Sequence, residues 1–157
     1  MGNAINAFDG HIRIEGLPER YAPGVEYLLT VVLEADGTAV AGFQISARYT
    51  DGDRRGWNAG ALQPVDARSQ VTDSASVSYL HQNAAGSVAF GGFGSSWSLI
   101  WTAPDTGDRV TINVAGNSGN ADNSPLGDLV FTTERTIDAS STMPLALTRD
   151  DRQAGPP

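Results

Sequence analysis

Alternation of apolar and polar side chains at every second residue is the feature that most constrains this fold. The pattern is clearest in four runs, each rich in β-branched or aromatic residues: Val25 to Leu33, Phe43 to Tyr49, Trp97 to Trp101 and Val110 to Val114. Successive side chains of a β-strand point to opposite faces, so a period of two predicts strands with one buried face. The chain shows no stretch with the i, i+3, i+4, i+7 spacing of an amphipathic helix.

Turn signals separate these runs. Asp36-Gly37 and Asp51-Gly52 can supply the positive φ of tight turns, and Pro104 to Gly107 is a further turn signal. Weaker strand patterns bring the total to about seven, at the spacing of a sandwich; they cover His11 to Glu15, Ser76 to His81 and Leu129 to Ile137. The sequence therefore predicts an all-β domain of two packed antiparallel sheets, with a closed barrel as the structural alternative.

Composition excludes several classes of function. The chain has 157 residues, enough for one domain with its own core, and it has no cysteine, which excludes thiolate catalysis and cysteine-ligated metals. The formal net charge is -8 and the ten cations, all arginine, are scattered, so nucleic acid is not an expected partner. No apolar run is long enough to span a membrane, and the first residues do not form a signal peptide.

Three parts are expected along the chain. Residues 1–9 form a lead-in, residues 10–139 form the β-sandwich domain, and residues 140–157 form a linker or frayed tail in which Met143, Leu145 and Leu147 alternate. The polar stretch from Gly52 to Thr72 is expected to hold one short strand around Trp57 to Leu62.

The order of short sequence fragments resembles a known family. The fragments are Gly16 to Gly24 followed by Tyr27 to Val31, Gly42-Phe43-Gln44, the pair Tyr79 and His81, Trp101 to Pro104 with Gly107, Ala115-Gly116-Asn117, Gly127-Asp128 and Thr132-Thr133. In this order they resemble the reeler-like "choice-of-anchor V" domain of bacterial exported proteins. The resemblance covers about residues 10 to 137.

The resemblance implies an immunoglobulin-like antiparallel β-sandwich of about seven to eight strands. It also implies a non-catalytic module, secreted or held at the bacterial cell surface, for adhesion, protein interaction or spacing between domains. Its partner would be a protein or another cell-surface component. Some members carry a haem-attachment Cys-x-x-Cys-His segment before the first strand, whereas Gly2 to Gly10 here contain no cysteine. The alternative is an accessory module of an extracellular electron-transfer protein, with its haem segment outside this chain.

A loop rich in Asn and Asp is a candidate metal site. Asn117, Asn120, Asp122 and Asp128 offer the amide and carboxylate oxygens that calcium prefers, at short spacing. The alternative is a connection in which these side chains bond to their own backbone. Calcium is the one cofactor considered; otherwise no cofactor is expected.

An exposed aromatic residue flanked by arginines is a candidate interface. Arg54, Arg55 and Trp57 lie in a polar stretch, which suits an interface anchor. The alternative is that Trp57 covers a sheet edge. The other tryptophans, Trp97 and Trp101, share the face of Leu99 and are assigned to the core.

No catalytic residue is predicted. The alternation of Val77, Tyr79 and His81 places His81 inward, at the edge of the core and bonded to backbone. No serine lies in a nucleophile elbow, and no enzyme is expected. The glycine-rich stretch Gly86 to Gly94 lacks the context of a phosphate-binding loop and is expected to be a flexible loop.

Overall fold

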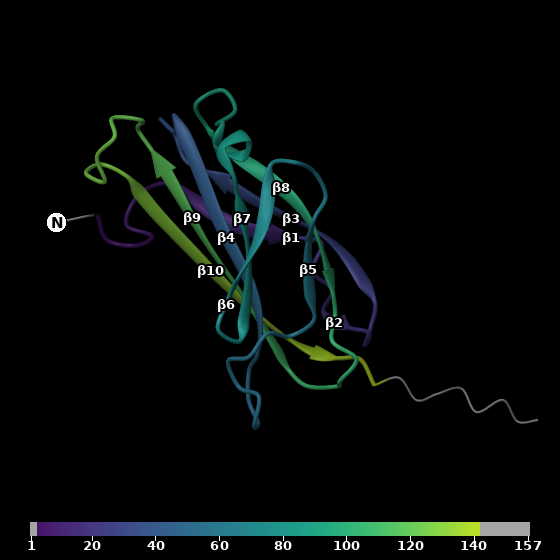
Figure 1. Ribbon diagram of the computed structural model, residues 1–157. Helices are drawn as coiled ribbons and strands as arrows, with labels where there is room; N and C mark the ends of the chain where they lie inside the picture. The colour runs from purple at the N-terminus through teal and green to yellow at the C-terminus, as the bar shows by residue number, and fades with distance from the viewer. Residues whose placement is uncertain (1–2, 142–157) are drawn as a thin grey trace, which may run out of the picture.

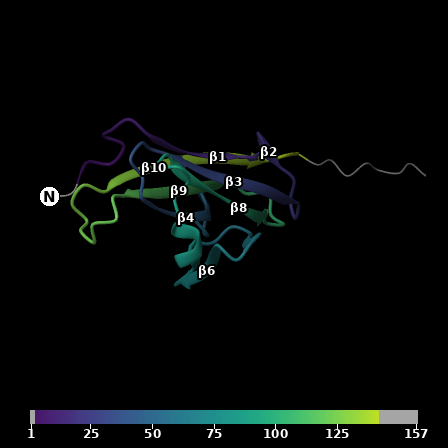
Figure 2. The same ribbon diagram turned by 90° about the horizontal axis from the view of Figure 1, so that it is seen from above.

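Two β-sheets pack face to face in the computed structural model, which describes residues 3–141 (Figure 1). The strands, in chain order, are β1 (His11–Glu15), β2 (Arg20–Tyr21), β3 (Glu26–Glu34), β4 (Val40–Tyr49), β5 (Ala61–Pro64), β6 (Ser69–Ser74), β7 (Val77–Gln82), β8 (Gly94–Thr102), β9 (Val110–Gly119) and β10 (Leu129–Ala139). Figure 2 shows the same strands from above, with β6 of the larger sheet standing away from β1 and β2. The predicted all-β sandwich is confirmed.

The two sheets are unequal. One has four strands in the order β1-β3-β8-β5, and the other has six in the order β2-β10-β9-β4-β7-β6. All pairs are antiparallel except β2 with β10, which is parallel. The strands beyond the predicted number are short or polar. β2 has two residues, and β6 is exposed along nearly its whole length, so neither shows the alternation of a half-buried strand.

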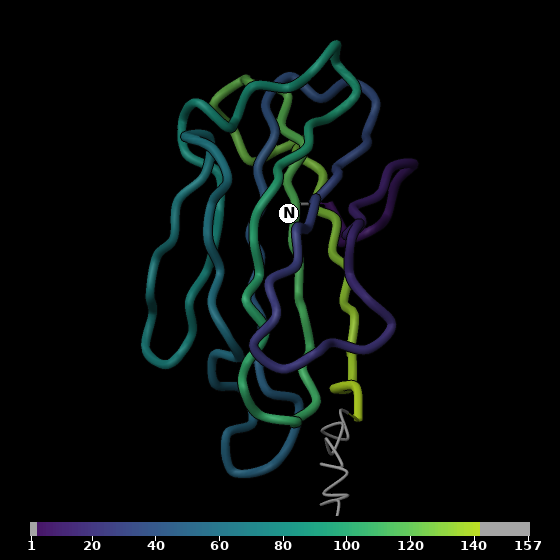
Figure 3. Tube along the Cα trace, turned by 90° about the vertical axis from the view of Figure 1, so that its right-hand side faces the viewer, coloured from purple at the N-terminus to yellow at the C-terminus, as the bar shows by residue number. Residues whose placement is uncertain are grey.

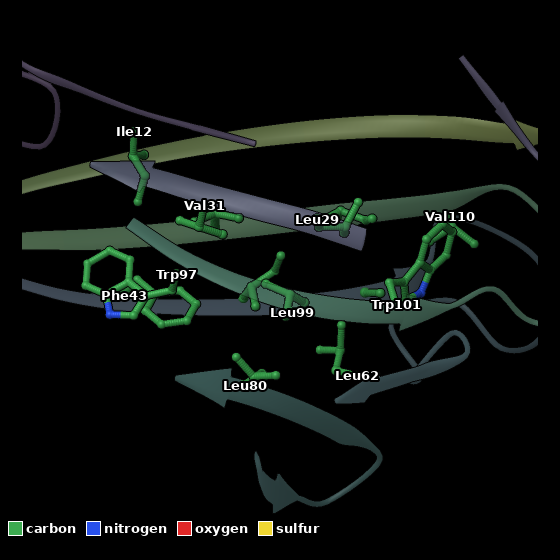
Figure 4. Packing of buried hydrophobic residues seen from close by; sticks show 14 of the residues in the cluster. Ile12, Leu29, Val31, Phe43, Leu62, Leu80, Trp97, Leu99, Trp101 and Val110 are labelled. Carbon is green, nitrogen blue, oxygen red and sulfur yellow. The ribbon is translucent and has the colours of Figure 1, made fainter. Parts of the chain in front are cut away.

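The core lies between the sheets and follows the predicted alternation. Register places Val31 opposite Trp97 on β3 and β8, and both side chains point at the other sheet. Phe43 of β4 stacks on Trp97 with ring centroids 4.4 Å apart, which joins the two sheets (Figure 4). Alternate residues of β4, β8 and β9 are buried, as predicted.

Trp101 is the centre of the other half of the core. Its ring packs edge-on against Tyr21 and stacks on Tyr27, with centroid distances of 5.6 and 5.8 Å. Its indole Nε1 donates a hydrogen bond of 3.0 Å to the Ala59 carbonyl oxygen. Gly60 permits this approach, because its φ is +82° and a Cβ there would lie 2.1 Å from the Thr102 carbonyl oxygen. The predicted core positions of Trp97 and Trp101 are confirmed.

Tyr21 closes one end of the sandwich. Its fully buried hydroxyl donates to the Thr106 carbonyl oxygen at 2.8 Å and also contacts the carbonyl oxygen of Asp108. Burial, with a smaller contribution from the Asp108 charge, raises the pKa of Tyr21 to about 12. The Tyr21 carbonyl oxygen accepts a hydrogen bond of 2.7 Å from the Ser140 amide, which ties the end of β10 to β2.

The residues before β1 run beside β10. The Asn6 amide donates to the Val130 carbonyl oxygen and the Asn6 side chain accepts from the Thr132 amide, both at 2.9 Å. Figure 3 shows this lead-in on one side of the sandwich and the β6–β7 hairpin on the other. The alternating residues Met143, Leu145 and Leu147 of the predicted tail lie outside the described residues. Between residues 3 and 141, no helix is long and apolar enough to cross a membrane.

Candidate functional site

Three residues of the candidate calcium site lie in the β9–β10 loop, and the fourth, Asn117, lies near the end of β9. The Asn120 side chain donates to the Asp122 carboxylate at 3.0 Å, and the Asn117 side chain donates to the Asp128 carboxylate at 3.4 Å. The Asp122 carboxylate also accepts from the Ser124 amide at 2.8 Å. The bond from the Ser124 amide is of the kind that the turn alternative expects, and all three bonds occupy oxygens that a cation would use.

Carboxylates are sparse in this loop. Nowhere between residues 3 and 141 do three or more His, Cys, Asp or Glu side chains gather as a metal-binding group. A calcium ion here would therefore depend on amide and backbone oxygens for most of its ligands. Calcium binding stays a prediction, and its test is given below.

The predicted interface residues lie on the β4–β5 loop, at the lower end of the sandwich in Figure 1. Trp57 is 55% exposed, and its backbone is fixed by a 2.9 Å hydrogen bond from its amide to the Arg54 carbonyl oxygen. The Arg54 guanidinium lies 4.3 Å from the centre of the Tyr49 ring and pairs with Asp108. Arg54 is thus engaged within the molecule, whereas Arg55 and Trp57 are exposed.

A second ion-pair group stiffens the same end. Arg109 pairs with Asp138 at 2.9 Å and lies 3.8 Å from Asp51. The hydrogen bond and charge of Arg109 lower the pKa of the Asp138 carboxyl. These contacts link the β4–β5 loop, the β8–β9 loop and β10 at the end of the sandwich that carries Trp57.

The opposite end carries exposed phenylalanines that the sequence analysis missed. Phe90 and Phe93, on the β7–β8 loop, are 57% and 66% exposed. The loop begins with a short 3₁₀ helix, Ala84–Ser87, whose first amides bond to the Asn83 side chain. The Phe90 amide then donates to the Gly94 carbonyl oxygen at 2.8 Å. The expected flexible loop is therefore a hydrogen-bonded turn that presents two aromatic rings.

Neighbouring loops extend this apolar surface. Val40 pairs with Val88 as an isolated bridge, and both side chains are exposed. The Phe93 carbonyl oxygen accepts a hydrogen bond of 2.9 Å from the Ala35 amide, which attaches the phenylalanine turn to the β3–β4 loop. We call Val40, Val88, Phe90 and Phe93 the apolar end. Its signal in the sequence was two phenylalanines in a glycine-rich stretch, where apolar residues have no strand periodicity to explain them.

The histidines do not form a catalytic or metal-binding pair. His81 faces outward, not inward as predicted: its Nε2 lies 2.9 Å from the Thr72 hydroxyl and its Nδ1 lies 2.9 Å from the Gln82 carbonyl oxygen. Leu80 is the residue of β7 that enters the core. His11 is exposed on the other sheet, beside Glu34.

Solved structures share this arrangement of strands. The human F-spondin reeler domain superposes with a TM-score of 0.60 at 18% sequence identity, over 87% of this chain and 93% of that domain. A structure of the Reelin-N domain of F-spondin gives a TM-score of 0.59 at 17% identity, over 87% and 90%. The chain has the reeler fold.

This chain is also similar in fold to a bacterial module. A cohesin module from a family 33 glycoside hydrolase of Clostridium perfringens gives a TM-score of 0.56 at 8% identity, over 83% of this chain and 96% of that module. Identities this low carry information on fold alone. No family model and no curated protein matches the sequence. The predicted reeler-like domain is thus confirmed in its architecture.

Proposed function

We propose that this chain is a non-catalytic protein-interaction module of an exported or cell-surface protein. The observation that carries the proposal is the apolar end, where Phe90 and Phe93 are more than half exposed on a turn fixed by backbone hydrogen bonds. Exposed apolar patches on soluble domains mark interaction sites, and aromatic residues are enriched at the centres of protein interfaces.

Rigidity favours binding at this end. Ordering a flexible loop costs free energy on association, and a loop already held by its own hydrogen bonds avoids most of that cost. The Arg68 guanidinium lies 5.2 Å from the centre of the Phe90 ring and donates to the Ser96 carbonyl oxygen at 3.0 Å, which braces the turn from β8. A protein partner would present an apolar pocket for the two rings and a polar rim around it.

Export and surface location are supported by two similarities. The sequence fragments described above resemble the choice-of-anchor domain of exported proteins. The reeler fold also occurs in F-spondin, and the similar cohesin module belongs to a larger glycoside hydrolase. The two similarities support the proposal that this chain is a module of a longer protein and serves in binding, adhesion or spacing between domains.

The test compares two surface variants at opposite ends of the sandwich. The described domain is used to capture a partner from cell-envelope extract, and the partner is then purified for affinity measurement. The double variant Phe90→Ser, Phe93→Ser is expected to weaken Kd by about 100-fold, as expected for two interface anchors. The matched control, Trp57→Ser, is expected to leave Kd within about two-fold.

Melting temperatures are measured for both variants and are expected to lie close to that of the unaltered chain. A partner that binds the double variant as tightly as the unaltered chain would refute the assignment of the apolar end. Loss of binding in Trp57→Ser alone would move the protein interface to the β4–β5 loop.

A further inference from the structure

The outward face of the six-stranded sheet is polar and hollowed, and it has no part in the interface proposed above. Strand register sets rows of outward side chains across this sheet. One row contains His81, Gln44, Ala115 and Thr132, contributed in turn by β7, β4, β9 and β10. The next row along the strands contains Asn113 of β9 and places it beside Glu134 of β10.

Two adjoining hollows cover these rows. Each has a volume of about 430 Å³, and they share Gln44, Tyr79 and Ala115. Both hollows are open to solvent, so a ligand would lie along them with one side exposed. Because Ala115 is small, the floor between the hollows is low, and together they form one trough that runs along β4 and β9. We call it the sheet trough.

The centre of the sheet trough has unused hydrogen-bonding groups. Between residues 3 and 141, no side-chain hydrogen bond engages Gln44, Asn113 or Glu134. The two amides offer both donors and acceptors, and the carboxylate offers acceptors. Elsewhere on the surface, amides such as Asn6 and Asn83 bond to the backbone of their own chain. The amides of Gln44 and Asn113 are thus available to a ligand, and unlike other unbonded amides they lie in a hollow.

The side of the sheet trough is rigid and aromatic. The Arg48 guanidinium lies 5.5 Å from the centre of the Tyr79 ring and donates to the Tyr79 hydroxyl at 3.1 Å. Thr72 and His81 are joined at 2.9 Å, which holds the β6–β7 hairpin as a wall. A tyrosine supplies an apolar ring surface together with a polar tip, and this wall keeps it in place.

The charges that line the sheet trough indicate the charge of a ligand that could bind there. Arg48 and Glu134 are its charged lining residues, apart from His81, and their charges cancel. The whole chain carries a formal net charge of -8, so a polyanion would be repelled on approach. A ligand with many hydroxyl groups and no net charge matches unused amides beside an aromatic ring.

We propose that the sheet trough, where Gln44, Asn113 and Glu134 lie beside Tyr79, binds a neutral oligosaccharide. Sugar hydroxyls donate and accept at once, as the amides do, and the apolar face of a sugar ring packs on an aromatic ring. The two hollows follow one another along β4 and β9, so consecutive sugar units would lie along these two strands. This site is separate from the apolar end and adds glycan recognition to the proposed protein-interaction role.

Titration with defined sugars tests the proposal. The probes are hexasaccharides of glucose, mannose and xylose, with a heparin hexasaccharide as the anionic arm and an uncharged Gly-Ser peptide as the polymer arm. Amide chemical shifts of the 15N-labelled protein report where each probe binds. At least one neutral hexasaccharide is expected to shift residues of the sheet trough with a Kd of about 1 mM or tighter.

Variants then locate the contacts. The double variant Gln44→Ala, Asn113→Ala is expected to weaken binding at least about ten-fold. Ala115→Ile, which raises the floor shared by the two hollows, is expected to do the same. The matched control Gln63→Ala, on the exposed face of β5, is expected to leave Kd unchanged. Melting temperature and circular dichroism establish that each variant is folded.

Several results would overturn the proposal. These are no binding of any neutral hexasaccharide, equal binding by the trough variants, tighter binding of heparin, or equal binding of the Gly-Ser peptide. The double variant Phe90→Ser, Phe93→Ser is expected to retain sugar binding. If this variant loses protein binding and keeps sugar binding, the two sites are independent, and either proposal can fail without the other.

Discussion

Truncation of Trp101 to alanine tests whether one core joins the two sheets. The Trp101 side chain is 0% exposed and lies between Tyr21 and Tyr27, so its removal leaves a cavity that the surrounding β-sheets cannot close. Substitutions of this kind lower the free energy of unfolding by about 3–5 kcal/mol.

The lost hydrogen bond adds to this loss. Without the indole Nε1, the buried Ala59 carbonyl oxygen loses its hydrogen-bond donor. A buried acceptor without a donor lowers the free energy of unfolding by about 1–3 kcal/mol. The total for Trp101→Ala is therefore expected at or above the upper end of the range, about 5 kcal/mol. Trp101→Phe keeps most of the ring and loses the donor, so about 1–3 kcal/mol is expected.

Urea denaturation, monitored by circular dichroism, measures both changes. Trp57→Ala serves as control because its ring is 55% exposed, and a loss below about 1 kcal/mol is expected for it. A loss below about 1 kcal/mol for Trp101→Ala would mean that the ring does not join the sheets. Equal losses in Trp101→Ala and Trp101→Phe would refute the role of the ring volume.

Three further predictions concern pH, backbone and metal. Between pH 10 and 12 the unfolded chain has lost the Tyr21 proton that the folded chain keeps, so stability falls by about 2–3 kcal/mol as pH rises through this window. Denaturant titration across these pH values should show a smaller fall in Tyr21→Phe. Gly94→Ala places a Cβ 1.9 Å from the Leu33 carbonyl oxygen, so it is expected to lower the free energy of unfolding by about 3 kcal/mol or more in denaturant titration. Gly37→Ala has open space around its Cβ and is expected to lower this free energy by only about 1–2 kcal/mol. Calcium at about 1–10 mM is expected to raise the melting temperature by a few degrees, and Asp122→Asn is expected to abolish the rise. Identical melts in calcium and in chelator would leave the β9–β10 loop as turn chemistry alone.

The strands that face the core could be predicted because burial on one side forces a period of two. Phe43 and Trp97 follow that period, and their stacking between the sheets agrees with it. The same rule misplaced His81. In β7 the alternation of Val77, Tyr79 and His81 looks like a buried face because its members are apolar or aromatic. These side chains point outward, and Leu80 is the residue of β7 that enters the core. β6 could not be predicted from alternation, since nearly all of its residues are exposed.

Surface sites were harder to predict for a different reason. Phe90 and Phe93 lie on a turn that is bonded to the β3–β4 loop, and turn contacts leave no periodic pattern in a sequence. The sheet trough depends on register, which brings Gln44 and Asn113 from distant segments onto one face. The exposure of Trp57 was accessible to sequence reasoning because its neighbours are polar and charged, although the strand expected around it begins only at Ala61.

The pairing of β2 with the end of β10 has a mechanical consequence. In Figure 1 the lead-in and the end of β10 lie at opposite ends of the molecule, so tension between them runs along the strands. Ladder hydrogen bonds are perpendicular to the strands, and β10 is bonded to β9 from Leu129 to Ile137, so these bonds would be sheared together instead of peeling one by one. The Ser140 bond to Tyr21 fastens the point where the pull enters. Under stretching, the sandwich would behave as a stiff link between whatever is joined to its two ends.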